Sequence, residues 1–380
     1  MQKFSGYSQL DFINKVNVKL SNNTNLIHGI YLSKSSNIPR YDRLILYEDI
    51  FTPKYGEWYY GPNYFLMNKI ELNNFRKTNY YDAFKLNISN QIVKECRHSR
   101  LFNNNFLKNR NEKVDIISLN LDFDKKFKND EIFYGYEFIF NNVNSEANSL
   151  NIISNETSII SSRYPDNGTQ YFSNSLYISY KKKIGKIFSN VGLRGNMSRL
   201  ESKLSNQILE FPFSEINLNT SSISGNIGFR YNYKNSSFKI QYSNGFRNPN
   251  LDDLGKVFDS EPGNIIMPNA DLEPEYVNNY ELNYEFKSDK IILKNTFFYI
   301  KLNNAIIRTD SKFNGKDSII YDGVLSKVQQ LNNGSKAYIY GFSNLLNLKL
   351  NESIDLEHTI SFNNSKDKIN NRPLRHSSPL

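Results

Sequence analysis

The sequence predicts an all-β protein, and more narrowly an antiparallel transmembrane β-barrel. Three observations support this prediction. Apolar and polar residues alternate in many segments of about ten residues, the links between the segments are alternately short and long, and low average hydropathy accompanies many aromatic residues. In a barrel wall one face of each strand meets lipid while the other meets water or polar filling, so alternation over about 9–11 residues is expected.

Alternation is clearest where aromatic residues occupy every second position, as from Tyr134 to Phe140. A period of two is typical of β-strands, and no comparable stretch has the period of a helix. About fourteen strands are predicted, at residues 9–20, 25–33, 64–73, 79–88, 114–123, 131–142, 170–181, 186–197, 221–231, 237–245, 276–286, 291–302, 337–350 and 353–363.

The links between these strands distinguish a membrane barrel from a soluble sandwich. Outer-membrane barrels have short periplasmic turns and long extracellular loops. A soluble sandwich has no reason to collect every long loop at one end. The predicted short links include residues 21–24, 74–78, 182–185, 287–290 and 351–352, and the long ones are 34–63, 89–113, 143–169, 198–220, 246–275 and 303–336.

The composition agrees with a thin wall better than with an ordinary globular core. Only 39% of residues are hydrophobic and the mean hydropathy is −0.59, yet the chain has 26 Tyr and 27 Phe. The absence of an apolar run of 18 residues excludes a membrane-spanning helix, whereas a barrel strand needs only alternate apolar residues. Composition alone would also suit a soluble all-β protein with aromatic strands.

Charge and chemistry-bearing residues exclude several functions. The net charge is +9, but Lys and Arg are scattered among Asp and Glu, and no recognition helix or zinc spacing accompanies them, so no nucleic-acid partner is expected. The single Cys96 rules out an internal disulfide framework. The four His lie far apart and no catalytic motif is present, so we expect no enzyme activity, no catalytic residue, no metal site and no cofactor.

The most specific motif surrounds one long loop. A strand ends in a GFRNP sequence, and about twenty residues later the chain reads NADLEPE before the next strand. These motifs resemble those of TonB-dependent outer-membrane receptors, in which a strand leaves the membrane with a GFRxP-like turn and re-enters at an NPxLxPE-like motif. Ala270 replaces the first Pro of that second motif. The matching residues are Gly245, Phe246, Arg247, Pro249, Leu272, Pro274 and Glu275.

The motif residues have structural roles on elementary grounds. Gly245 is expected to adopt a backbone geometry closed to other residues. Pro249 and Pro274 fix φ where ladder hydrogen bonding has ended, so their missing N–H groups cost little. Arg247 either pairs with a loop carboxylate and holds the loop down, or is simply solvated. Its candidate partners are Asp252, Asp253 and Glu261.

Two further stretches, residues 33–44 and 57–62, resemble a branch of the same family. The resemblance implies an active outer-membrane importer whose external loops capture a scarce nutrient, such as a ferric siderophore or a cobalamin-like molecule. The implied partners are outer-membrane lipid and an inner-membrane TonB-type energy-coupling complex. Candidate ligand contacts are Trp58, Tyr59, Tyr60 and Arg247, although aromatic residues at loop bases also form interfacial girdles.

Two other functions stay open at this stage. A passive porin-type channel shares the loop alternation but not the GFRNP and LEPE motifs. A soluble or surface-attached β-rich binding module would remain in water without detergent.

The resemblance also sets an expectation about extent. Large transporters of this kind have 22 strands and a plugged lumen. Residues 1–380 are therefore expected to form part of a receptor barrel domain, about fourteen strands without the plug. The start of the chain has no apolar signal core, and its last residues resemble an external loop, so a fragment is expected.

Overall fold

The computed structural model describes residues 5–205, 208–261, 263–321, 323–368 and 371–374. Within these ranges, twenty strands form one continuous sheet. The helices described are two single turns, α1 (Tyr41–Leu44) and α2 (Leu251–Leu254). No helix in the described part of the chain is long and apolar enough to cross a membrane.

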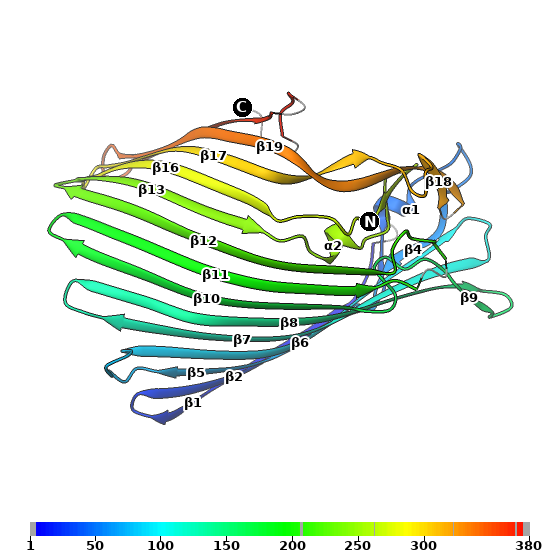
Figure 1. The fold of residues 1–380 in the computed structure, drawn as a ribbon, viewed down its shortest axis with the longest axis horizontal. Helices are drawn as coiled ribbons and strands as arrows, with labels where there is room; N and C mark the ends of the chain where they lie inside the picture. Colours follow the sequence, from blue (N-terminus) through cyan, green and yellow to red (C-terminus); the bar gives the residue numbers. More distant parts are fainter. Residues whose placement is uncertain (1–4, 206–207, 262, 322, 369–370, 375–380) are drawn as a thin grey trace.

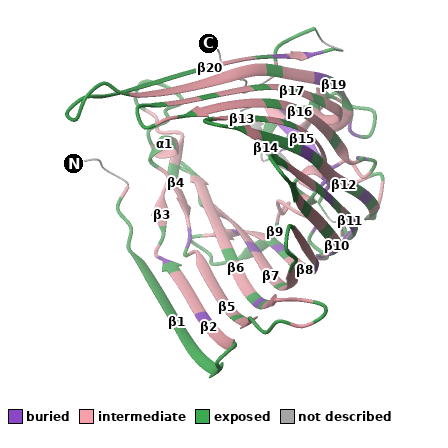
Figure 2. Cartoon of the chain, turned by 90° about the vertical axis from the view of Figure 1, so that its left-hand side faces the viewer, coloured by how far each residue is buried: buried purple, intermediate pink, exposed green. Residues whose placement is uncertain are grey.

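Fourteen long strands build a curved wall, and each is hydrogen-bonded antiparallel to the next (Figure 1). Viewed along the strands, the wall bends round most of a circle, with β1 and β20 at its two ends (Figure 2). The long strands are β1 (Gln9–Ser21), β2 (Thr24–Ser35), β5 (Tyr64–Asn74), β6 (Ala83–Leu101), β7 (Phe106–Lys126), β8 (Asp130–Asn151), β10 (Thr169–Ile184), β11 (Ile187–Lys203), β12 (Glu215–Tyr233), β13 (Ser236–Arg247), β16 (Glu275–Lys287), β17 (Ile291–Asp310), β19 (Val324–Lys349) and β20 (Asp355–Asp367).

Each predicted strand overlaps one long strand, so the predicted fold class is confirmed. Several boundaries were wrong. Links predicted as loops at 89–113 and 303–336 consist largely of strand, and roughly half of 143–169 and 198–220 is strand, because β6, β7, β8, β11, β12, β17 and β19 extend beyond the alternating segments.

Backbone pairing continues through the extensions of β6, β7 and β8 without an apolar face, whereas Leu200 and Ile216 in the extensions of β11 and β12 belong to a buried apolar cluster. Cys96 lies opposite Asn111, and Asn109 donates from Nδ2 to Oδ1 of Asn148 at 2.9 Å. Polar side chains such as Asn109 and Asn148 stand where an alternating apolar residue would be, so the sequence loses its period of two while the ladder persists. The predicted start at residue 79 was also early, since β6 begins at Ala83.

Short strands that the sequence did not predict lie within the loops. They are too brief for alternation to be recognised, at two to six residues each. They are β3 (Ile38–Pro39), β4 (Tyr55–Tyr60), β9 (Thr157–Ile159), β14 (Phe258–Glu261), β15 (Asn264–Met267) and β18 (Ser318–Tyr321).

The two ends of the wall differ as the link lengths predicted. Tight turns at residues 22–23, 185–186 and 234–235 join strands at one end, on the left of Figure 1. The opposite end carries α1, α2, β4, β9 and β18. We call these the short-turn end and the long-loop end.

The outer face of the wall is apolar and exposed. Leu176 and Ile223 are 67% and 71% exposed. Such a surface is costly in water and is expected of a wall that faces lipid. Aromatic residues also line up across strands, one per strand, in a row that runs through β13, β16, β17 and β19. The members of this row are Tyr242, Tyr280, Tyr299 and Tyr340.

The inner face carries small polar side chains. Asn196 of β11 donates from Nδ2 to Oγ of Ser173 at 2.9 Å and of Ser175 at 2.8 Å. Beside them, the hydroxyls of Ser198 and Thr220 lie 2.7 Å apart. These short side chains satisfy one another across strands and leave room inside the wall.

Buried apolar clusters lie at the long-loop end rather than in the wall. Residues 248–274, which we call the exit loop, fold back against the inner face, and β15 pairs in parallel with β19. One cluster joins this loop to β11 and β12, and the other joins it to the loops beside β18 and β19. Their buried members are Leu200, Leu204, Ile216, Leu254 and Leu272, and Val257, Ile265, Met267, Phe313, Tyr321 and Val328.

Candidate functional site

The exit loop begins with a turn that is held by hydrogen bonds. Pro249 is fully buried just beyond β13, and α2 follows directly. Asn250 caps α2: its Oδ1 accepts from the Asp253 backbone N–H at 3.0 Å, and the Asp253 carboxylate accepts from the Asn250 N–H at 3.0 Å. This reciprocal capping box fixes the start of the turn. Leu254, with no exposed surface, then anchors the turn in the apolar cluster.

Arg247 ties the two ends of the exit loop together. Its Nη1 lies 2.6 Å from Oδ2 of Asp253, and its Nε lies 2.7 Å from Oε2 of Glu275, the residue opposite it in the ladder. The hydrogen bond to Glu275 and that to Asp253 raise the pKa of Arg247 above its usual value. Pairing with a loop carboxylate was predicted, and Asp253 confirms it. The second partner, Glu275, was not predicted.

The return of the loop is held by main-chain partners. Glu275 also accepts a hydrogen bond from the backbone N–H of Ile306. Leu272 is 2% exposed within the apolar cluster, and Pro274 stands directly before β16. Phe246 lies opposite Tyr276 in the ladder. The motif residues therefore sit at the two ends of one closed loop.

The expectation for Gly245 was wrong. Its φ lies outside the left-handed region that favours glycine. The constraint is space: a Cβ at this position would lie 3.3 Å from Cγ1 of Val277, its partner across the ladder. Glycine thus allows close approach of two strands as they leave the wall.

The neighbouring carboxylates Asp252 and Asp253 have different partners. Asp252 accepts from the Tyr164 hydroxyl at 2.6 Å and pairs with Lys256 at 2.9 Å. Burial and this hydrogen bond raise the pKa of the Tyr164 phenol. Asp252 therefore joins the exit loop to the loop after β9, whereas Asp253 joins it to β13.

A second group of side chains gathers round Arg40, which lies between β3 and α1 at the long-loop end. The Arg40 guanidinium lies 5.1 Å from the Trp58 ring centre and 4.8 Å from that of Tyr60, and it donates to the Tyr60 hydroxyl. Arg97 approaches the Tyr60 ring at 5.4 Å. Tyr60 lies opposite Arg97, on the same face of the sheet as Ser89. This is the polar inner face, so the group points inward.

Tyr59 belongs to the opposite face. It stacks on His98 with ring centres 4.7 Å apart, and His98 Nδ1 lies 2.6 Å from Oδ1 of Asn109. The four candidate contacts therefore fall into separate groups. Trp58 and Tyr60 face inward, Tyr59 faces the other way, and Arg247 is engaged in its own ion pairs.

Arg40, Arg97 and Glu112 were not predicted from the sequence as site residues. Glu112 is 7% exposed, and both carboxylate oxygens are buried without a hydrogen-bond partner among the described residues. Burial raises its pKa to about 7, with Glu95 adding to the effect and Arg97 opposing it. Arg40 follows the Ile38-Pro39 pair within residues 33–44, a stretch that resembles the family, and that was the one available signal.

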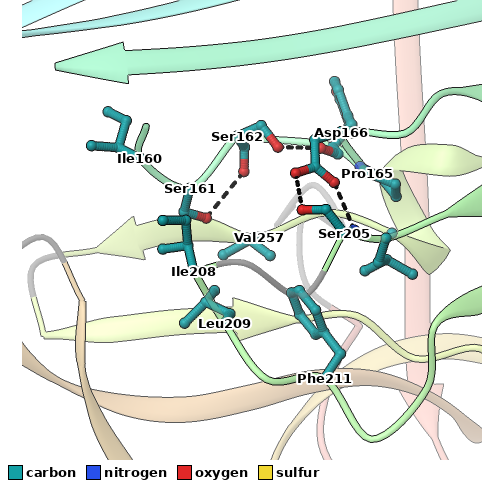
Figure 3. Close-up of a pocket in the computed structure, with 13 residues that line it drawn as sticks. Ile160, Ser161, Ser162, Pro165, Asp166, Ser205, Ile208, Leu209, Phe211 and Val257 are labelled. Carbon is teal, nitrogen blue, oxygen red and sulfur yellow. Dashed lines mark hydrogen bonds between the residues drawn. The ribbon is translucent and has the colours of Figure 1, made fainter. Parts of the chain in front are cut away.

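The loops beside the exit loop pack closely against it. A cavity of about 30 Å³ lies among Ser162, Asp166, Ser205 and Phe211, where Ser205 donates both N–H and hydroxyl to the Asp166 carboxylate (Figure 3). A volume of this size suits one water molecule. In the described ranges, no cluster of three or more His, Cys, Asp or Glu could hold a metal ion.

The fold and this end of the molecule define a class: the wall of a transmembrane β-barrel whose long loops fold into its mouth. The chain belongs to the family described as TonB dependent receptor-like, beta-barrel, whose model matches residues 6–379. The resemblance seen in the sequence is thus confirmed.

Solved structures of similar fold include one transporter and two receptors. The copper transporter OprC has a TM-score of 0.75 at 9% identity, covering 97% of this chain and 55% of that one. The hemophore receptor HasR of Serratia marcescens, in complex with its hemophore HasA and heme, has 0.67 at 13%, covering 94% and 54%. The alcaligin outer-membrane receptor FauA of Bordetella pertussis has 0.59 at 12%, covering 97% and 55%.

At these identities the likeness concerns the fold alone. The chain spans about half the length of the solved structures it matches. A sequence comparison with curated proteins gave no match.

Proposed function

We propose that residues 1–380 are the ligand-capturing barrel wall of a TonB-dependent active importer in the outer membrane. The cargo we propose is a small nutrient complex such as a ferric siderophore or a cobalamin-like molecule. The single observation that carries the proposal is the family match over residues 6–379. The folded long-loop end supplies the place where capture would occur.

The inward group around Arg40 supports capture at this end. Arg40, which pairs with Asp42 at 2.7 Å, and Arg97, which pairs with Glu95, hold their guanidinium groups beside the rings of Trp58 and Tyr60. Guanidinium groups bind carboxylates and other oxyanions, and flat rings give apolar contact area at little entropic cost. We therefore assign Trp58 and Tyr60 as ligand contacts, with Tyr59 behind them and Arg247 holding the exit loop.

Energy coupling belongs to the whole receptor. In this proposal a TonB-type complex acts through a plug segment that lies outside residues 1–380. The chain itself contributes the lipid-facing wall and the external loops.

Trp58 offers a direct test because it is the one tryptophan in the chain. The full chain, refolded in detergent, is titrated with a ferric trihydroxamate, a ferric triscatecholate, ferric citrate and cyanocobalamin. The tryptophan fluorescence is corrected for inner-filter absorption with free N-acetyltryptophanamide. We expect a saturable change with one of these probes, weakened by Arg40→Gln and by Tyr60→Phe.

Arg76→Gln is the matched control, because Arg76 is exposed at the short-turn end. It should leave the titration unchanged. A flat response to every probe, together with steady ion conductance of the chain in planar bilayers, would overturn the proposal in favour of a passive channel.

A further inference from the structure

Four lysine side chains gather on the outer face of the wall, near the long-loop end. They surround Tyr338 of β19, and we call them the lysine cluster. Lys301 of β17 and Lys366 of β20 both lie opposite Tyr338 in the ladder. Lys336 lies two residues from Tyr338 on β19, and its carbonyl oxygen accepts the backbone N–H of Lys368 at 2.8 Å. The cluster therefore spans three strands that lie side by side (Figure 2).

Alternation along the strands directs the lysine cluster outward. Tyr299 of β17 and Tyr340 of β19 belong to the tyrosine row on the outer face and are 40% and 42% exposed. Lys301 lies two residues from Tyr299 and therefore shares its face. Lys336 shares a face with Tyr340 for the same reason, at a separation of four residues. Lys366 faces the same way, because residues opposite each other in a ladder share a face.

The height of the lysine cluster on the wall is that of lipid headgroups. On β19, Phe342 lies on the outward apolar face, opposite Phe297, which is 52% exposed. Tyr340 and Tyr338 follow towards the long loops, with ring centres 6.2 Å apart, and Lys336 comes next on the same face. Rows of aromatic residues mark the two membrane–water interfaces of a barrel. The lysines therefore stand just outside the apolar band, at the end that is external in barrels of this kind.

Carboxylates do not neutralise the lysine cluster. Within the described ranges, no carboxylate lies at ion-pair distance from any of its four ammonium groups. Asp367 lies between two of the lysines in the sequence, but it is 8% exposed and its side chain takes the opposite, inner face. Lys336 and Lys368 continue the ladder by one step, so two like charges face each other. Such a pair destabilises a sheet unless an anion lies nearby.

We propose that the lysine cluster binds the phosphate groups of an anionic lipid in the external leaflet of the membrane. Ammonium groups bind phosphate oxygens as point charges, and clusters of basic side chains at a membrane surface attract anionic lipids. The Lys368 ammonium lies 5.5 Å from the centre of the Tyr338 ring, and the attraction between cation and ring keeps this charge beside the cluster. The apolar face below the cluster accommodates the acyl chains of the same lipid, which a free phosphate ion lacks.

The spacing of the lysine cluster suits a headgroup with more than one phosphate. Lys301 and Lys366 are two strand spacings apart, or about 10 Å between backbones. Lys336 is about 7 Å from Tyr338 along β19, because each residue advances about 3.3 Å. A single phosphate cannot reach across this area, whereas a lipid with two phosphate groups can contact lysines of all three strands.

The test uses the full chain in neutral detergent micelles, with native mass spectrometry to count the lipid molecules that stay bound. The micelles are doped with lipid A, a glucosamine disaccharide lipid that carries two phosphates, or with phosphatidylcholine as the zwitterionic reference. We expect saturable retention of lipid A alone, with an affinity that falls as salt is added. In Lys336→Gln/Lys368→Gln the affinity should fall at least about tenfold, because each basic side chain at an anionic surface contributes roughly a factor of five. Lys336→Arg/Lys368→Arg, which keeps both charges, should retain it.

The matched control is Lys287→Gln/Lys290→Gln, which removes two exposed lysines at the short-turn end, between β16 and β17, and should leave the affinity for lipid A unchanged. Equal affinities of the wild type and Lys336→Gln/Lys368→Gln, or retention of lipid A no greater than that of phosphatidylcholine, would overturn the proposal. So would binding of sodium tripolyphosphate, in undoped micelles, that is as tight as that of lipid A and depends on the same two lysines. Circular dichroism confirms that each variant keeps its strand content.

Discussion

Replacing Arg247 with Ala removes the link between the two ends of the exit loop. The guanidinium donates to Asp253 at 2.6 Å and to Glu275 at 2.7 Å. Hydrogen bonds to charged groups contribute about 1.5–3 kcal/mol each when well shielded. Because the Arg247 side chain is 45% exposed, water screens the pairs, and we discount each to about 1 kcal/mol. The expected loss is about 2 kcal/mol of loop docking.

Trypsin cleavage after Lys256 measures this loss. The Lys256 side chain is 14% exposed and paired with Asp252, so cleavage requires the exit loop to open. When opening is fast compared with cleavage, the cleavage rate follows the population of the open form. A loss of about 2 kcal/mol then raises the rate about 30-fold. Mass spectrometry of the cleaved chain identifies the site.

Arg199→Ala is the matched control. Arg199 pairs with Glu201 of the same strand, and the two side chains are 60% and 36% exposed, so little change in cleavage at Lys256 is expected. Equal cleavage rates for wild type and Arg247→Ala would refute the view that this ion pair holds the loop. Arg247→Lys, which keeps the charge without the planar fork, should give an intermediate rate.

Three further variants test other parts of the structure. Leu254→Ala empties a fully buried position in the exit-loop cluster and should cost about 2–4 kcal/mol of loop docking, read from the same trypsin assay. Burial raises the Glu112 pKa to about 7, so the folded protein favours the neutral carboxyl, and this contribution to stability is lost as pH rises through that value. Glu112→Gln should therefore raise the free energy of unfolding in urea by about 2 kcal/mol at pH 8 and by little at pH 4.5. A difference that does not depend on pH would contradict this. Gly135→Ala should lower the free energy of unfolding in urea by about 1–3 kcal/mol, because a Cβ there would collide with the Leu121 carbonyl oxygen and displace the Tyr177 side chain. An unchanged free energy of unfolding would argue against that contact.

The sequence predicted the wall because lipid on one face and polar groups on the other force a period of two. It could not predict where the strands end. Beyond the apolar band of β7 and β8 both faces carry polar side chains, so residues such as Asn109 and Asn148 pair without leaving any periodic signal. The short strands within the loops could not be predicted for a related reason. For example, β15 joins β19 through contacts between residues about sixty positions apart.

The candidate site was also only partly predictable from the sequence. The GFRNP and LEPE motifs located both ends of one closed loop, and a carboxylate partner for Arg247 followed from charge and proximity along the chain. The partnership with Glu275 depends on strand register, which the sequence does not specify. The gathering of Trp58 and Tyr60 round Arg40 depends on the pairing of β3 with β4, and Arg97 joins them through the pairing of β4 with β6, a contact across about forty residues.

The distribution of apolar residues has a consequence for how this molecule unfolds. Its wall turns large apolar side chains outward, while its buried clusters lie only among the long loops and the adjoining strand ends of the described chain. The wall therefore relies on the surrounding amphiphile for its apolar contacts, and the long-loop end relies on its own packing. Each part therefore responds to a different change of solvent. A longer detergent tail should stabilise the strands of the wall without affecting the loops, whereas urea should unfold the loops at concentrations at which the strands remain folded.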